Sequence, residues 1–206
     1  MSAIASITLE VPDPVAAQAF YADAFGLHAE VLARAAQAPS TGFRGFAVSL
    51  VVSQPSTVDS LAGTALAAGA TVLKPVAKSF WGYGGVIRDP YGTIWKLASS
   101  SKKDTAPANR VIDDIVLLLG VDDVAATKRF YADNGLTVAK SYGRKYVEFA
   151  TSPIKLALYG RRAAAKDLGV AVDGDGSHRL VINGDNGCLT DPDGFAWDAA
   201  GCEAAR

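Results

Sequence analysis

The chain has 206 residues, of which 50% are apolar and 20% charged, so it is long and apolar enough to bury a core. Its formal net charge of −1 and its scattered basic residues give no reason to expect nucleic acid or an anionic membrane as a partner. No apolar run approaches the length of a membrane span, and the N-terminus lacks the basic region and long apolar core of a signal peptide.

The only two cysteines, Cys188 and Cys202, make neither a disulfide framework nor a zinc motif. The default interpretation is two free thiols in a reducing compartment, which predicts a cytoplasmic location. A disulfide between the two is left open, because the sequence alone does not decide pairing.

The first half begins with alternating residues at 6–11, which predict a half-buried strand with Ser6, Thr8 and Glu10 on one face. Asp13 then suits the cap, and Pro14 the first turn, of a helix that closes at Gly26. A second helix is expected from a start box at 56–59 to Gly69. Further strands are expected near 29–34, 46–52, 71–76, 83–88 and 93–98.

The second half follows a polar segment at 99–109 and opens with an apolar strand at 115–119. Asp123 predicts the cap of the next helix, and Asn134-Gly135 its end. A short helical stretch is expected at 161–168. Further strands are expected near 137–141, 145–149, 154–159, 179–182 and 195–199.

The tetrapeptide Phe-Tyr-Ala-Asp occurs twice, at Phe20–Asp23 and at Phe130–Asp133. Each copy has a matching downstream segment, Asp89–Lys96 in the first half and Asp191–Asp198 in the second. Repeated landmarks in the same order indicate an internal duplication, with a period of domain size rather than solenoid size. We therefore expect a domain at 1–100, a linker at 101–109 and a second, shorter domain at 110–206.

The order of strand, Val-x-Asp, helix with Phe-Tyr, and Asp-Pro-x-Gly-x-x-Trp resembles the vicinal oxygen chelate superfamily. That superfamily includes glyoxalase I, extradiol dioxygenases and bleomycin-resistance proteins, and the segment from Lys74 to Trp95 is similar to its glyoxalase-like branch. The resemblance implies an α+β fold of tandem βαβββ-type units. Their curled mixed sheets form a cup, with helices on the outer face.

The two halves depart from the family pattern in complementary ways. The first half has no counterpart of the strand pair within Lys145–Tyr159, and the second has no counterpart of the helix at Val58–Ala68. A sheet without its covering helix exposes an apolar face, so the two halves are expected to fit together as one body.

The resemblance also implies a divalent metal, held by His, Gln or Glu on the first, middle and last strands. The corresponding positions hold Ser6 and Val116 on the first strands, and Lys96 and Asp198 on the last. A lysine ammonium has no lone pair to donate, so no metal and no other cofactor is expected. The remaining alternative is a metal in the second half, with Asp114, His178 and Asp198 as ligands.

The strand alternation places Ser6, Thr8, Glu10 and Lys96 inside the first cup, and Trp81 and Tyr83 flank its mouth. These six residues are the candidate ligand-binding set. Glu10 and Lys96 are also the candidate catalytic pair, as a base and an anion anchor, although the pattern favours a structural ion pair between them. Four aromatic residues in the repeated segments are expected to pack in the core and to have no direct role in ligand binding: Tyr21, Trp95, Tyr131 and Trp197.

The function expected from this pattern is metal-independent binding of a small aromatic molecule in a β-sheet cup, of the drug-binding or natural-product resistance type. The alternative is a lyase or isomerase of the same superfamily, metal-free or with a metal in the second half. Whether the protein is an enzyme is left open. The expected partner is a small-molecule ligand, with no nucleic acid or membrane, and the chain is expected to be a monomer or homodimer.

Overall fold

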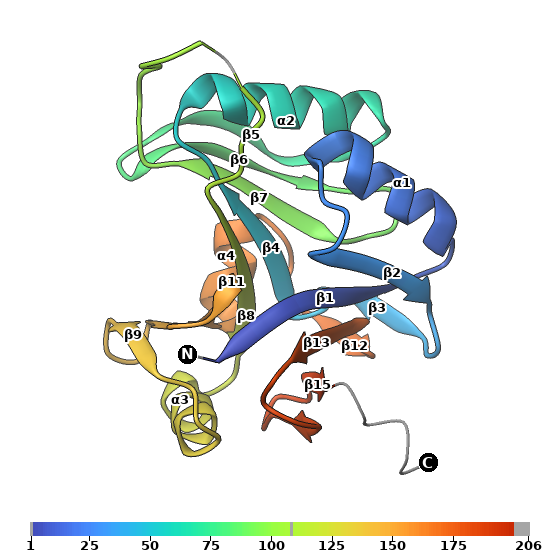
Figure 1. Ribbon diagram of the computed structural model, residues 1–206, viewed down its shortest axis with the longest axis vertical. Helices are drawn as coiled ribbons and strands as arrows, with labels where there is room; N and C mark the ends of the chain where they lie inside the picture. Colours follow the sequence, from blue (N-terminus) through green and yellow to red (C-terminus); the bar gives the residue numbers. More distant parts are fainter. Residues whose placement is uncertain (1, 108, 200–206) are drawn as a thin grey trace.

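A computed structural model describes residues 2–107 and 109–199. Figure 1 shows helices packed around one large, strongly curled sheet, which is the predicted α+β fold. The described helices are α1 (Pro14–Phe25), α2 (Pro55–Ala67), α3 (Val124–Asp133) and α4 (Arg161–Leu168).

The strands of both halves alternate in a 13-stranded mixed sheet. Its main path runs β14 (Leu189–Thr190), β15 (Ala196–Asp198), β13 (Leu180–Gly184), β1 (Ala3–Val11), β11 (Ser152–Gly160), β8 (Asp114–Val121), β4 (Phe46–Val51), β7 (Ile94–Ser99), β6 (Gly82–Arg88) and β5 (Thr71–Ser79). Attached to this path are β2 (Val31–Ala35), β10 (Tyr146–Phe149) and β9 (Val138–Ser141), whereas β3 (Ser40–Gly42) pairs only with β12 (Gly174–Gly176).

Two complete βαβββ units lie within this sheet. One contains β4, α2, β5, β6 and β7, and the other contains β8, α3, β9, β10 and β11. In both units the first strand lies next to the fourth, followed by the third and the second. The first strands β4 and β8 pair antiparallel, which joins one unit from each half into a single curled sheet.

Two partial units complete the fold. The first is β1, α1 and β2, in which β2 pairs parallel with β1. The second is β13, β14 and β15, and the described chain passes from β13 to β14 without a helix. β1 and β13 pair antiparallel, so each partial unit also joins a partner from the other half. Within the described residues, the chain between β2 and β4 contains only the short strand β3, and the chain between β13 and β14 contains no helix.

The caps of α1 and α3 form as the sequence predicts. The Asp13 side chain accepts a hydrogen bond from the backbone N–H of Ala16, and Gly26 ends α1 in the left-handed conformation, with φ of 75°. The Asp123 side chain accepts from Ala125 and Ala126 at the start of α3. These contacts satisfy amide groups that have no partner inside the helix.

The expected start box of α2 is wrong. The helix begins at Pro55, after Gln54, and Gln54 makes no side-chain cap hydrogen bond. Proline presets the backbone angle of a first helical residue, so the helix starts before the Ser56 hydroxyl could cap it. The Gln54 amide instead bonds to the backbone at residues 105–107, which fixes the predicted linker against α2.

Each repeated Asp-Pro segment ends in a buried polar contact beneath the helices. In the first half, Trp95 donates from Nε1 to Asp89 Oδ2 at 2.9 Å. In the second, Tyr131 donates to Asp191 Oδ2 at 2.8 Å, and Trp197 Nε1 donates to the Tyr131 hydroxyl at 3.2 Å. Burial raises the pKa of both aspartates, against hydrogen bonds that lower it. The aromatic side chains that we expect to be structural are all buried: Tyr21, Trp95, Tyr131 and Trp197.

Arg179 has a left-handed backbone with φ of 55°, and it is the only non-glycine residue in the described chain with positive φ. It precedes β13 as Gly45, with φ of 83°, precedes β4. Both carbonyl groups accept a hydrogen bond from the pairing strand, Arg179 from Glu10 and Gly45 from Gly120. A left-handed residue thus comes before β4 and before β13 alike. It is a glycine in the first case and an arginine in the second.

We expect Arg179→Gly to raise the free energy of unfolding by up to about 1 kcal/mol. Relief of about 1–2 kcal/mol of left-handed strain is partly offset by the greater backbone entropy of glycine when unfolded. The Arg179 Nε atom is buried without a partner, so little hydrogen bonding is lost. Urea unfolding of both proteins measures the difference, and a clear loss of stability would contradict the expectation.

Cys188 is disulfide-bonded, so the expectation of a free thiol at this position is wrong. Cys202, the other cysteine in the sequence, lies outside the described residues. The helices of the described chain include none that is long and apolar enough to cross a membrane.

Candidate functional site

The concave side of the sheet presents four neighbouring side chains at one level. Ser49 of β4 pairs in register with Lys96 of β7 and with Val116 of β8, and Val116 pairs with Lys155 of β11. The residues that alternate with these four, Val48, Trp95, Leu117 and Leu156, belong to the main core beneath the helices. Since side chains alternate between the two faces of a strand, the four-residue row faces into the cup between the complete units.

Helix α4 occupies part of this cup. Its Ala164, Ala165 and Leu168 side chains are buried in an apolar cluster with residues of the sheet and of the loop before β4. Figure 1 shows α2 above the strands β5–β7, α1 beside it over β2, and α4 below β5–β7, beside β8 and β11. Helices α1 and α2 thus cover the outer face of the sheet, whereas α4 packs against its concave face.

Both lysines of the row are paired with carboxylates. Lys96 Nζ lies 2.5 Å from Asp167 Oδ2 of α4, and Lys155 Nζ lies 2.7 Å from Asp114 Oδ2 of β8. All four side chains are about one-third exposed, so solvent screens both pairs. The floor of the cup therefore holds two ammonium groups, and one of them, Lys96, stands where the superfamily resemblance implies a metal ligand.

These residues do not fit a divalent metal. The lysine ammonium groups have no lone pair with which to coordinate a metal, and the valine side chain has no ligating atom. The Ser49 hydroxyl alone does not hold a divalent ion. Within residues 2–107 and 109–199, no group of three or more His, Cys, Asp or Glu side chains is placed to hold a metal ion.

The alternative metal candidates of the second half are engaged elsewhere. Asp114 is paired with Lys155. The two ring nitrogens of His178 lie 2.5 Å from the carbonyl oxygen of Arg44 and 2.9 Å from that of Asp193. Asp198 lies on β15, beside Asn183 of β13. The structure does not bring the three candidates together.

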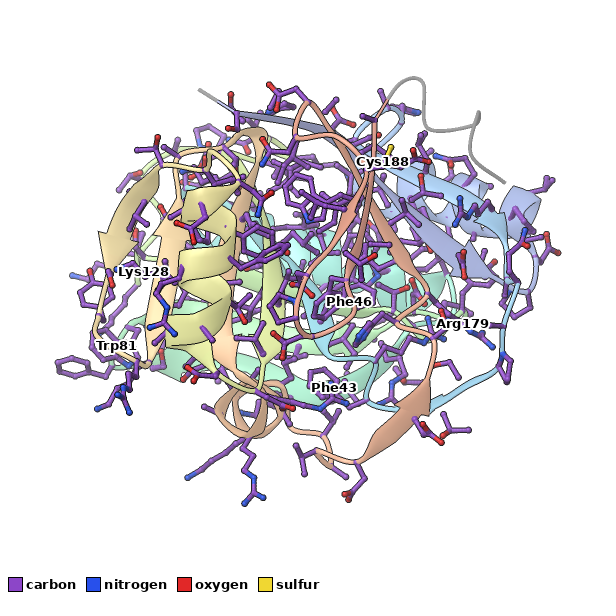
Figure 2. The ribbon with its side chains drawn as sticks, turned by 90° about the horizontal axis from the view of Figure 1, so that it is seen from below. Phe43, Phe46, Trp81, Lys128, Arg179 and Cys188 are labelled. Carbon is purple, nitrogen blue, oxygen red and sulfur yellow. The ribbon has the colours of Figure 1, made fainter. Side chains whose placement is uncertain are left out.

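A cavity of about 410 Å³ lies in the cup beside α4, against β5, β6 and β7. Lys74, Lys78, Lys96, Asp167 and Trp81 contribute to its lining, with the glycines of β6. Figure 2 shows the Trp81 side chain at the edge of the molecule, and it is 84% exposed. Trp81 and Lys96 thus both line this cavity, Trp81 between β5 and β6 and Lys96 on β7, where it contacts α4.

Tyr83 is also among the residues that line this cavity. Its hydroxyl donates to Asp59 Oδ1 of α2 at 2.8 Å, and its ring packs against the core under the helices. Tyr83 therefore borders the cavity, while its ring and hydroxyl extend to the helix face of the sheet.

Ser6, Thr8 and Glu10 lie on β1, whose neighbours are β2, β11 and β13 rather than β7. The Asn183 amide donates to both the Ser6 and Thr8 hydroxyl groups at 2.9 Å. Glu10 is paired with Arg34 at 2.6 Å.

The expected ion pair between Glu10 and Lys96 is therefore wrong, because the two side chains have different partners on different elements. The structure brings Trp81, Tyr83 and Lys96 to one cavity but does not bring the β1 candidates to it.

Sequence reasoning missed Asp167, Lys74 and Lys155. The match between the two Asp-Pro segments drew attention to Asp198, but the last strand of the second complete unit is β11, which carries Lys155. The alternation of Lys155 with Ile154 and Leu156 was the available signal that this lysine faces away from the core.

No protein-family model matches the chain. No curated protein sequence matches it either. Among solved structures, glyoxalase I from Zea mays is similar over 97% of this chain and 92% of its own length, with a TM-score of 0.61 and 14% identity. A candidate dioxygenase from Bacillus subtilis is similar over 88% of this chain and 69% of its own, with a TM-score of 0.52 and 15% identity.

The chain therefore has the fold of glyoxalase I, which is the fold that the sequence resemblance implies. At identities this low the likeness concerns the fold alone, and chemistry has to be argued from this chain's own residues.

Proposed function

We propose that the protein binds a small, planar organic molecule in the cavity against β5–β7, without a metal ion. The observation that carries the proposal is that one cavity of about 410 Å³ joins the exposed ring of Trp81 to the ammonium group of Lys96. Ligand cavities in proteins typically measure about 300–1,000 Å³, so the space suits a molecule of one or two rings. The glycines of β6 leave a smooth wall along which a flat ring can lie.

The roles of the two named side chains differ. Trp81 offers a large aromatic surface at the mouth, where stacking does not depend on the identity of the ring. Lys96 offers a positive charge at the inner end, which favours an anionic or strongly polar substituent. Metal independence belongs to the same proposal and is supported by the lysines and the valine in the floor of the cup.

An enzyme that uses Glu10 as a base and Lys96 as an anion anchor receives no such support. Acid–base catalysis requires both groups within hydrogen-bond reach of one substrate. Glu10 is held by Arg34 on β2, and Lys96 is held by Asp167 on α4.

We expect Trp81→Ala to weaken the binding of a cavity ligand by about 1–3 kcal/mol, since removal of an aromatic side chain that stacks on a ligand ring typically costs that much binding free energy. The matched control is Tyr83→Phe, which should leave affinity unchanged because its hydroxyl contacts Asp59 of α2. Ligands are first identified by thermal stabilisation in a panel of planar aromatic compounds, and affinities are then measured by calorimetry after dialysis against a chelator. Loss of binding after the chelator treatment, or equal losses in the two variants, would count against the proposal.

A further inference from the structure

The cavity against β5–β7 contains an excess of positive charge. Lys74, Lys78 and Lys96 line it, and Asp167 is the only carboxylate among the described residues of its lining. Two of these ammonium groups are bound to the last turn of α4: Lys96 to the Asp167 carboxylate, and Lys74 to the backbone carbonyl of Lys166 at 3.0 Å. The end of α4 thus presents oxygen atoms to the lysines.

The end of a helix supports this role in two ways. Its last carbonyl groups have no partner inside the helix, and the helix dipole makes this end negative. Gly169 closes α4 in the left-handed conformation and lies against the Lys74 stem, since a Cβ atom there would approach Lys74 Cγ to 3.1 Å. Lys74 and Lys96 therefore pack closely against the C-terminal end of α4 inside the cup.

We propose that Asp167 occupies the position of a ligand's anionic group, so that the ligand carries a carboxylate, sulfonate or phosphate and displaces Asp167 from Lys96. This inference rests on the proposed function and adds the chemical class of the ligand. The displaced pair is weak: at about one-third exposure, an ion pair shifts an equilibrium by no more than about 5-fold. A ligand anion replaces the carboxylate charge and adds ring contacts that Asp167 does not make.

Removing the competitor should strengthen binding of an anionic ligand. We therefore expect Asp167→Asn to bind anilinonaphthalenesulfonate, an anionic planar dye, about 2–5-fold more tightly than the native chain. Phenylnaphthylamine, a neutral dye with a closely similar ring system, should bind both proteins equally. In a Lys96→Met background, the Asp167→Asn substitution should no longer change the affinity for the anionic dye, because the cation for which the two anions compete is gone.

Asp114→Asn is the matched control for net charge. It removes one carboxylate from the same cup, but from the pair with Lys155, which lies on β8 and β11 and does not line the cavity. Fluorescence titration of the full chain measures all affinities, and circular dichroism checks that each variant is folded.

The outcomes separate the two proposals. If both dyes bind in a Trp81-dependent manner but Asp167→Asn leaves the anionic dye unchanged or weaker, the displacement of Asp167 is overturned and the cavity assignment stands. An equal gain with Asp114→Asn, or an equal gain for the neutral dye, also overturns the displacement. If neither dye binds in a Trp81-dependent manner, the proposed function fails, and this inference fails with it.

Discussion

The second half of the chain, residues 110–206, is expected not to fold when it is produced alone. In the full chain, β8 pairs with β4 and β13 pairs with β1, so separation removes a strand neighbour from both. The buried side chains of these two strands lie in one core with residues of the first half: Leu117, Leu119, Leu180 and Ile182.

Exposing a buried leucine or isoleucine costs about 1.5–3 kcal/mol, and a whole domain is stable by only about 5–15 kcal/mol. Four such side chains therefore remove most of the stability available to the fragment. Circular dichroism and thermal melting should show no cooperative transition. The control is co-expression with residues 1–109, which should restore a soluble complex. A soluble fragment with a sharp unfolding transition on its own would contradict the expected mutual dependence of the halves.

Asp89→Asn is expected to destabilise the protein by about 2–3 kcal/mol. Asp89 Oδ1 accepts from the backbone N–H groups of Tyr91 and Thr93, and Oδ2 accepts from Trp95. An asparagine amide placed either way turns an NH₂ group toward a donor, which leaves a buried hydrogen bond unmade.

The equivalent Asp191→Asn substitution is the matched control and should cost only about 1 kcal/mol. There the second carboxylate oxygen faces the Tyr131 hydroxyl, which can rotate and accept from the new NH₂ group as well as from Trp197, so the main loss is the acceptor of its own O–H. Urea unfolding of the two variants gives the comparison. Equal losses would show that the donor arrangement at Trp95 does not determine the cost.

Local signals predicted much of the fold. Asp13 and Asp123 are short polar residues before apolar helical patterns, and both cap a helix as expected. Trp95 and Trp197 follow the repeated Asp-Pro segments and are both buried. These features depend on residues close in sequence, so one chain contains the information needed to place them.

The position of α4 could not be predicted in the same way. Its bounds agree with the expected 161–168 segment, and its spacing of Ala164, Ala165 and Leu168 indicates one apolar face. An apolar face indicates that the helix packs against another part of the protein, but it does not indicate which surface that is. The contact of Asp167 with Lys96 joins residues 71 positions apart, and only the folded chain brings them together.

The candidate site was predicted in part for the same reason. Lys96 alternates with the core residue Trp95, which placed its side chain in the cup. Tyr83 is surrounded by Gly82, Gly84 and Gly85, so no apolar alternation indicated its face. The β1 candidates were assigned to the same cup as Lys96 by position in the chain, whereas the sheet separates β1 from β7 by three strands.

The central claim is that the cavity against β5–β7 holds an anionic planar ligand without a metal ion. A crystal structure of the chelator-treated protein with the tightest-binding compound tests this most directly. We predict the ring against Trp81 and the anionic group within hydrogen-bond distance of Lys96 Nζ, with Asp167 turned away. A compound bound far from both residues, or held by a metal ion in the cup, would contradict the claim.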